Sequence, residues 1–238
     1  MAIKIKSTSE MELDSVKCVA YGGAGVGKTR LCATAPTPLI ISAEEGLLSL
    51  AETDCQYIEI TSLSELDESY RFILNDSKKP EPEYETICLD SLSEICEVLL
   101  QNCLPNHKDP RQAYAEMASA TMPLLRKFRR LKRMNTIFTS KLIQRQDEES
   151  GVITQELFIP GQVIPNQVPY MVDELFCMQV DRKAVPYLQT QPDRTRFCKD
   201  RSGALEAKEY GQDGQIPNMT TIFNKIMEKR KLAHGTTT

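Results

Sequence analysis

The chain has 238 residues, of which 41% are hydrophobic and 26% charged, and its formal net charge is −4. This length and composition suit one large α/β domain with a well-formed core, rather than two compact domains. The longest apolar runs have the length of strands and the first residues lack a signal-peptide pattern, so we expect a cytoplasmic protein with no membrane span. Because the net charge is negative, any nucleic-acid binding must come from a local basic surface.

The eight cysteines indicate a reducing environment. Most of them lie inside apolar runs, and their spacing does not match a metal-binding pattern. We therefore expect small core residues, and neither disulfides nor a zinc site.

Apolar runs and helical patterns alternate along the first 140 residues. Strands are predicted at 17–21, 39–43, 55–60, 86–90 and 136–140, and helices at 29–35, from Ser62 to about Asn75, from Ser91 onward, and from about Ala113 to Met134. Both Ser62 and Ser91 are followed three residues later by glutamate, which is the spacing of a capping box. Pro123 is expected to kink or divide the last of these helices. Strands that alternate with helices at this spacing predict a parallel sheet with helices on both faces.

The pattern changes after residue 140. The segment 141–170 is polar and interrupted by prolines, with one predicted hairpin strand at 152–158. Three further strands, predicted at 174–180, 186–190 and 194–199, indicate an antiparallel extension of the sheet. An amphipathic helix is predicted at 219–231. Residues 2–6 alternate like a short edge strand, and the tail 233–238 is expected to be disordered.

Residues 22–29 match the phosphate-binding pattern G-x-x-x-x-G-K-[ST] at every specified position. A predicted strand enters this stretch and a predicted helix leaves it, as the pattern requires. Lys28 would supply a cation to the β- and γ-phosphates, and Thr29 a hydroxyl to Mg²⁺. The alternative, a glycine-rich turn that only connects strand and helix, is disfavoured. We predict a nucleoside-triphosphate site formed by Gly22, Gly23, Ala24, Gly25, Val26, Gly27, Lys28, Thr29 and Arg30.

Acidic residues end two of the predicted strands. Asp90 would hold Mg²⁺ through water opposite Thr29, or would cap the helix that begins at Ser91. Glu44 would orient or deprotonate the attacking water, although it could also be a solvated loop carboxylate and Glu45 could take the same role. No guanine-reading [NT]-K-x-D stretch is present, so the sequence favours ATP.

These residues together resemble the RecA-type ATPase core. The resemblance rests on residues 42–47, which read Ser-Ala-Glu-Glu-Gly-Leu, on Leu89-Asp90-Ser91, on the basic helix that leads into 135–141, and on 195–201. It spans about residues 17–205 and implies one RecA-like P-loop NTPase domain over 1–232, with Glu44 as the catalytic glutamate. In that family, the pair matched by Lys199 and Arg201 reaches the γ-phosphate bound by the neighbouring subunit, which implies a ring or filament. The alternative is a charged edge strand.

The small size is most similar to the compact phage RecA-core proteins found among recombination genes, some of which anneal single strands. The resemblance thus implies single-stranded DNA and a single-strand-binding protein as partners. It departs at Lys141, where RecA has glutamine, and in 141–170, which is acidic where the RecA loop is glycine-rich. A solvated helix face is the alternative for the basic helix. The cations predicted to contact DNA are Lys108, Arg111, Arg126, Arg129, Arg130, Arg133 and Arg145.

Two other functions compete with an ATPase that acts on single-stranded DNA. The acidic loop and the negative net charge favour a nucleotide-gated scaffold that binds a protein and turns over slowly or not at all. Phosphate loops also serve small-molecule kinases, but no arginine-rich lid is visible in this sequence.

Overall fold

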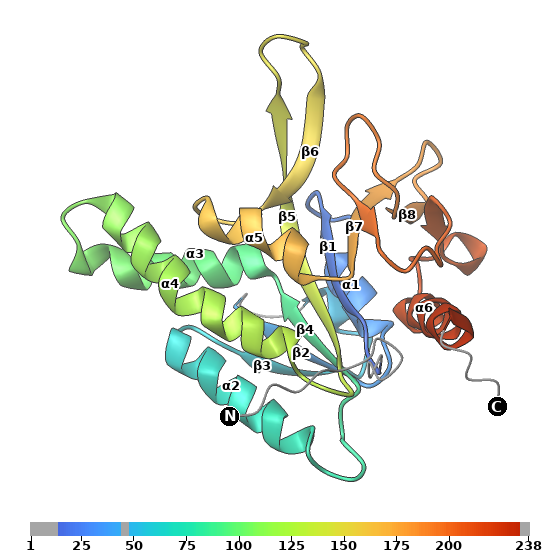
Figure 1. Cartoon of the computed structure of the whole chain (residues 1–238), viewed down its shortest axis with the longest axis horizontal. Helices are drawn as coiled ribbons and strands as arrows, with labels where there is room; N and C mark the ends of the chain where they lie inside the picture. Colours follow the sequence, from blue (N-terminus) through green and yellow to red (C-terminus); the bar gives the residue numbers. More distant parts are fainter. Residues whose placement is uncertain (1–13, 44–47, 234–238) are drawn as a thin grey trace, which may run out of the picture.

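Within the residues that the computed structural model describes, 14–43 and 48–233, ten strands form one mixed sheet (Figure 1). The strands are β1 (Lys17–Gly22), β2 (Pro38–Ser42), β3 (Gln56–Glu59), β4 (Thr86–Asp90), β5 (Asn135–Gln146), β6 (Ile153–Phe158), β7 (Glu174–Val180), β8 (Pro186–Gln189), β9 (Lys199–Asp200) and β10 (Lys208–Tyr210). The helices are α1 (Lys28–Ala33), α2 (Leu63–Asp76), α3 (Leu92–Cys103), α4 (Pro110–Arg129), α5 (Val163–Met171) and α6 (Met219–Ala233).

Six of the strands run parallel, in the order β7-β1-β5-β4-β2-β3. The phosphate-loop strand β1 therefore lies between β5 and β7, and β4, which ends in Asp90, lies beyond β5. Parallel strands all end at one edge of their sheet, so the loop after β1 and the carboxyl end of β4 face the same crevice. The predicted α/β fold with a mostly parallel sheet is confirmed.

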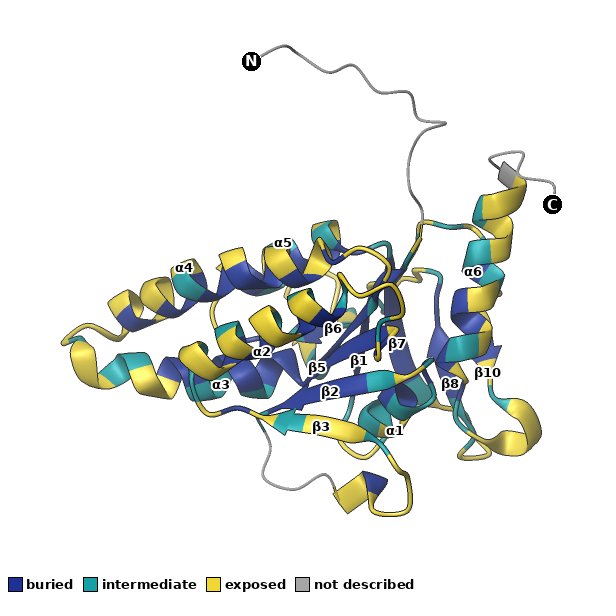
Figure 2. Cartoon of the chain, turned by 90° about the horizontal axis from the view of Figure 1, so that it is seen from below, coloured by how far each residue is buried: buried dark blue, intermediate teal, exposed yellow. Residues whose placement is uncertain are grey.

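Helices cover both faces of the sheet (Figures 1 and 2). Alternate side chains of β1 point to opposite faces, as the pleat requires. Val19 and Tyr21 join the core beneath α2, α3 and α4, whereas Cys18 and Ala20 join the core beneath α1 and α6. The capping serines confirm the predicted helix starts, since Ser62 accepts from the backbone N–H of Glu65 and Ser91 does the same for α3.

Two antiparallel additions extend the parallel core. The second half of β5 pairs with β6 from Lys141 to Gln146, and this hairpin projects from the sheet (Figure 1). On the other side, β7 pairs with β8 and β8 with β10, while the short β9 pairs with the start of β7. The predicted antiparallel extension is therefore present.

Helix α4 differs from its prediction at both ends, and it is not divided at Pro123. It begins at Pro110, capped by Asp109, ends at Arg129, and continues through Pro123 without dividing. Proline removes one helical hydrogen bond, but Met122 and Leu124 are buried on either side of it, and this packing keeps the helix intact. The predicted extension to Met134 is wrong, because the residues after Arg130 leave the helix and lead directly into β5.

The segment after β6 also differs from expectation. The stretch predicted as irregular contains α5, in which Pro165 lies in the first turn, where its missing N–H costs little. The strand predicted at 194–199 shortens to β9. The Asp193 side chain accepts hydrogen bonds from the backbone N–H groups of Thr195 and Arg196, which removes those donors from a strand ladder.

Several predictions lie outside the described residues. They are the edge strand at 2–6, the catalytic Glu44 and the tail from residue 234. Helix α6 is confirmed, and Thr34 caps it by accepting from the backbone N–H of Met219. In the described part of the chain, no helix combines the length and apolarity needed to cross a bilayer.

Candidate functional site

The loop between β1 and α1 has a backbone that requires its glycines. Gly27 has φ 100°, which an L side chain rarely adopts. A Cβ on Gly22 would lie 2.6 Å from the carbonyl oxygen of Met178 in the neighbouring strand β7, so only glycine fits that approach. No side chain caps the N-terminus of α1. The glycine pattern thus reflects a tight turn that leaves backbone N–H groups available to a phosphate.

Lys28 is the first residue of α1, and its side chain folds back over the loop. Its Nζ donates to the carbonyl oxygens of Gly22 at 3.0 Å and Gly23 at 2.8 Å. The side chain is only partly buried, so the ammonium can exchange these carbonyls for phosphate oxygens without disturbing the core.

Asp90 ends β4 with a side chain that is 3% exposed. One carboxylate oxygen accepts from the Thr139 hydroxyl, and the other has no hydrogen-bond partner among the described residues. The helix cap that sequence reasoning left as an alternative falls to Ser91 instead. A buried carboxylate oxygen without a partner is costly unless a cation or water satisfies it. Asp90 and the Thr29 hydroxyl are hard oxygen donors, which fit Mg²⁺.

The two groups line one cavity of about 400 Å³ at the carboxyl edge of the sheet. Gly22, Gly23 and Val26 are not among its lining residues, and Val26 packs against the core beneath α1. Sequence reasoning did not assign Ser49, Ser91 and Lys141 to this site. The cavity is lined by Ala24, Gly25, Gly27, Lys28, Thr29, Arg30, Ser49, Asp90, Ser91 and Lys141.

Lys141 reaches the cavity because β5 lies between β1 and β4. Its Nζ is 2.8 Å from Glu94 and 2.7 Å from Glu97, both on α3. Partial burial would lower its pKa, but the hydrogen bonds to the two glutamates outweigh it and raise the pKa above the ordinary value. Lys141 is thus a cation that two glutamates hold in position at the cavity. It is also the first residue of the projecting hairpin. The sequence signal that could have identified Lys141 is its position immediately after the predicted buried strand 136–140.

Glu44 cannot be placed, because it lies outside the described residues. Strand β2 ends two residues before it, with Ser42 paired in register with Asp90. The catalytic role of Glu44 therefore stays a prediction.

A family model described as an AAA domain matches residues 14–202, which is most of the chain. The chain belongs to the AAA domain family. A search of curated proteins finds no match. One similar solved structure is described as a prototypical ATPase from the type III secretion system of pathogenic bacteria. It shares 13% identity with a TM-score of 0.43, and the alignment covers 71% of this chain and 52% of that one.

Outside the nucleotide cavity, this AAA domain places Lys199 and Arg201 toward the amino ends of the strands, away from its own phosphate loop. The Nζ of Lys199 donates to the carbonyl oxygens of Pro169 at 2.6 Å and Val172 at 2.5 Å, and burial lowers its pKa. Arg201 is largely exposed and lies 3.9 Å from Asp173. Any contact of this pair with a γ-phosphate must therefore involve another subunit's nucleotide.

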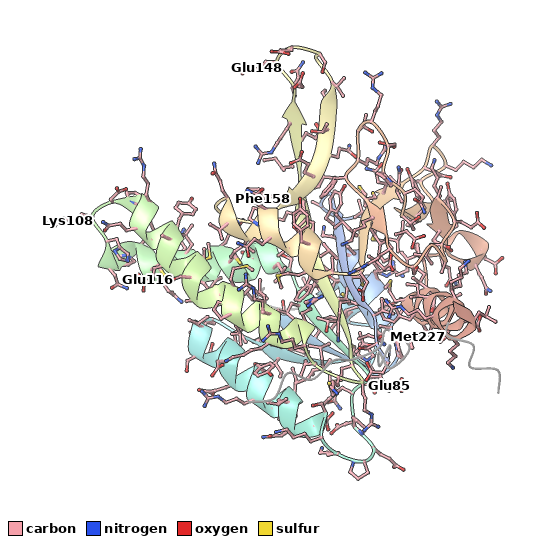
Figure 3. All side chains as sticks on the ribbon, viewed as in Figure 1. Glu85, Lys108, Glu116, Glu148, Phe158 and Met227 are labelled. Atoms are coloured by element: carbon pink, nitrogen blue, oxygen red, sulfur yellow. The ribbon has the colours of Figure 1, made fainter. Side chains whose placement is uncertain are left out.

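The cations predicted to contact DNA lie in separate places on the AAA domain. Lys108 lies in the loop between α3 and α4, at the far end of that helical pair (Figure 3), and Arg111 lies in the first turn of α4. Arg133 donates to the carbonyl oxygens of Lys79 and Pro80 and so holds the loop after α2.

Two further groups of these cations flank α5. Arg145 pairs with Glu156 across the hairpin at 3.3 Å. At the other end of α4, a hollow of about 310 Å³ collects the remaining three arginines with residues of α5. It is lined by Arg126, Arg129, Arg130, Gln167, Tyr170 and Met171.

Proposed function

We propose that this AAA domain is a Mg²⁺-dependent ATPase of RecA type that acts on single-stranded DNA in phage-type recombination or annealing. The observation that supports the ATPase activity is the cavity in which the phosphate loop meets the Asp90 oxygen that has no hydrogen-bond partner among the described residues. A glycine-rich loop with a lysine binds phosphates, and a buried carboxylate beside a threonine hydroxyl binds Mg²⁺. Together these groups define a site for a metal–triphosphate complex.

In the proposed mechanism, Lys28 leaves the loop carbonyls and neutralises the β- and γ-phosphates. Thr29 and Asp90 would hold Mg²⁺, which supplies charge neutralisation between those phosphates. Glu44 takes a proton from water as the water oxygen attacks the γ-phosphorus, and the bond from that phosphorus to the β,γ-bridging oxygen breaks. The products are ADP and inorganic phosphate.

The proposed site is shared between subunits, with Lys199 and Arg201 reaching the nucleotide of a neighbour. The support is that both side chains lie away from their own chain's phosphate loop. Mixing an Arg201→Ala chain with a Glu44→Ala chain tests this, because some interfaces in a mixed ring or filament combine two intact halves. We expect partial recovery of hydrolysis. No recovery under conditions where the mixed assembly forms would overturn the shared site.

The proposed action on single-stranded DNA is tested by measuring ATP hydrolysis with and without a single-stranded oligonucleotide. The support is the arginine-lined hollow beside α5 and the resemblance to recombination proteins. We expect the oligonucleotide to bind and to raise the rate. If it neither binds nor stimulates, the DNA role is wrong and the ATPase assignment stands.

A protein-binding scaffold is the second candidate, because the tip of the projecting hairpin is acidic. Asp147, Glu148 and Glu149 lie there in sequence, and Figure 3 shows Glu148 at the tip. Such a tip repels phosphates and suits a basic protein surface. A stable protein complex formed only with ATP, together with undetectable hydrolysis, would favour this function.

A further inference from the structure

The carboxyl-terminal turns of α4 and α5 enclose the hollow of about 310 Å³ that contains the three arginines. Arg126 donates to the Gln167 side chain at 2.8 Å, and Arg129 donates to the carbonyl oxygen of Met171. Each guanidinium has five N–H donors, so most of them stay available after these bonds. In residues 14–43 and 48–233, no carboxylate forms a salt bridge with Arg126, Arg129 or Arg130. Three cations that have no carboxylate partner within these residues form a site for an anion.

The aromatic ring of Tyr170 stands at the rim of this hollow. It is 84% exposed, more than any other aromatic residue in the described part of the chain. Tyr170 also lines a second hollow of about 280 Å³, which lies between α5 and the hairpin. Phe197, 49% exposed, and the Arg145–Glu156 pair line that second hollow. Two exposed rings therefore follow one path over α5, with the three arginines at one end and the Arg145–Glu156 ion pair at the other.

We propose that a single strand of nucleic acid crosses α5, with a base stacked on Tyr170 and phosphates on Arg126 and Arg130. This inference rests on the proposed DNA function and specifies where the strand lies. A ring can stack only on a base whose face is open, so the surface suits an unpaired strand and not a duplex. The combination of exposed rings with three arginines that have no carboxylate partner in the described residues suits a polyanion with flat apolar faces. The path differs from the loop contacts implied by the RecA resemblance, because it is centred on a helix that the sequence pattern does not predict.

Fluorescence anisotropy with a labelled oligo-dT of about 16 nucleotides measures the stacking contribution. Tyr170→Ala should weaken binding about 5- to 150-fold, and Tyr170→Phe should bind like wild type because the ring remains. Tyr57→Ala is the matched control, since Tyr57 is 50% exposed on β3, the far edge of the sheet. It should leave binding unchanged.

The salt dependence measures the phosphate contacts. Removing two phosphate-bound cations with the double variant Arg126→Gln and Arg130→Gln should reduce the slope of log affinity against log salt by about 1.4. Arg182→Gln removes an exposed cation in the turn between β7 and β8 and should leave the slope unchanged. An unchanged slope in the double variant would overturn the phosphate contacts.

Cross-linking of an oligonucleotide that carries 5-iodouracil locates the strand directly. We expect adducts on Tyr170 or Phe197. Adducts confined to 104–112 or to the hairpin tip, with full binding by Tyr170→Ala, would overturn the path while keeping the DNA role. Equal binding of duplex and single strand by wild type and Tyr170→Ala would indicate general polyanion binding and would also overturn it. If the wild-type protein binds no oligonucleotide with or without ATP, the proposed DNA function itself fails.

Discussion

The two ends of the parallel sheet contain the same kinds of charged residue in opposite situations. At the carboxyl ends of the strands, Asp90 keeps one oxygen without a hydrogen-bond partner in the described part of the chain. Lys28 lines the same cavity, is partly exposed, and donates to two carbonyl oxygens of its own loop. These groups can change partners when a ligand binds.

At the amino ends, the buried charges have fixed partners. Lys17 donates to two backbone carbonyls that precede β5, and burial lowers its pKa to about 8. Glu174 accepts from the backbone N–H groups of Arg201 and Ser202, and burial, reinforced by the nearby Asp200 carboxylate, raises its pKa to about 7. These side chains join loops to the sheet and so stabilise the fold.

The comparison teaches that a buried lysine or carboxylate does not by itself identify a site. The hydrogen-bond partners of the group distinguish the two cases. A charged group that is satisfied by the backbone of its own chain stabilises the fold, whereas one that lacks a hydrogen-bond partner is available to a ligand. Substitutions at the two ends should therefore separate ligand binding from stability.

Among the substitutions proposed, Lys28→Ala should have the largest effect. It should weaken ATP binding without changing the stability of the fold. Loss of charge-assisted hydrogen bonds to two phosphates should weaken ATP binding about 100-fold, or about 3 kcal/mol. The free energy of unfolding should change by less than about 0.5 kcal/mol, because the side chain is only partly buried. Titration with a fluorescent ATP analogue and urea unfolding measure the two quantities, with the exposed Lys78→Ala as control. Wild-type affinity in the Lys28 variant would refute the site.

Glu174→Gln should act on the pH dependence of stability. A carboxyl group with a pKa of about 7 in the folded protein and about 4.5 when unfolded binds protons more tightly in the folded state. Its contribution to stability is thus complete below pH 4.5 and is lost as the pH rises through 7, by about 2–3 kcal/mol. Urea unfolding between pH 4.5 and 8 should show this loss in wild type and a flatter profile in Glu174→Gln. Equal slopes would contradict the buried protonated carboxyl group.

Lys199→Met tests the comparison most directly, because the proposed shared site gives this lysine a catalytic role, while its own hydrogen bonds are with backbone carbonyls of the fold. It should lower the free energy of unfolding by about 2 kcal/mol, since the carbonyls of Pro169 and Val172 lose their donor. Arg201→Ala is the matched control and should cost under about 0.5 kcal/mol, because that side chain is largely exposed. Unchanged stability with lost hydrolysis in Lys199→Met would instead support the role in a neighbouring site.

Asp90→Asn should have the smallest effect, about tenfold in the Mg²⁺-dependent part of ATP affinity. An asparagine oxygen can still accept from the Thr139 hydroxyl, so the fold should persist. ATP titrations with Mg²⁺ and with a chelator measure the effect, and the chelator condition should show no difference between variant and wild type. A loss of affinity that is equal in both conditions would exclude a metal role for Asp90.

The features that the sequence predicted depend on contacts between residues close in the chain. The glycine pattern around Lys28 follows from local backbone geometry, and the serine caps of α2 and α3 depend on a hydrogen bond across three residues. The strand period and the apolar helix faces are equally local, so the parallel sheet with its covering helices was predictable.

What the sequence could not predict depends on contacts between distant segments. Lys141 enters the nucleotide cavity only because β5 inserts between β1 and β4, and the polar stretch around Pro165 becomes a helix when Ile164 and Val168 reach the core. Local sequence determined the phosphate loop, because that loop is built from neighbouring residues. Only the tertiary structure decided which other charged residues line the cavity and which are hydrogen-bonded within the fold. The reason is that packing alone brings these residues together with their partners.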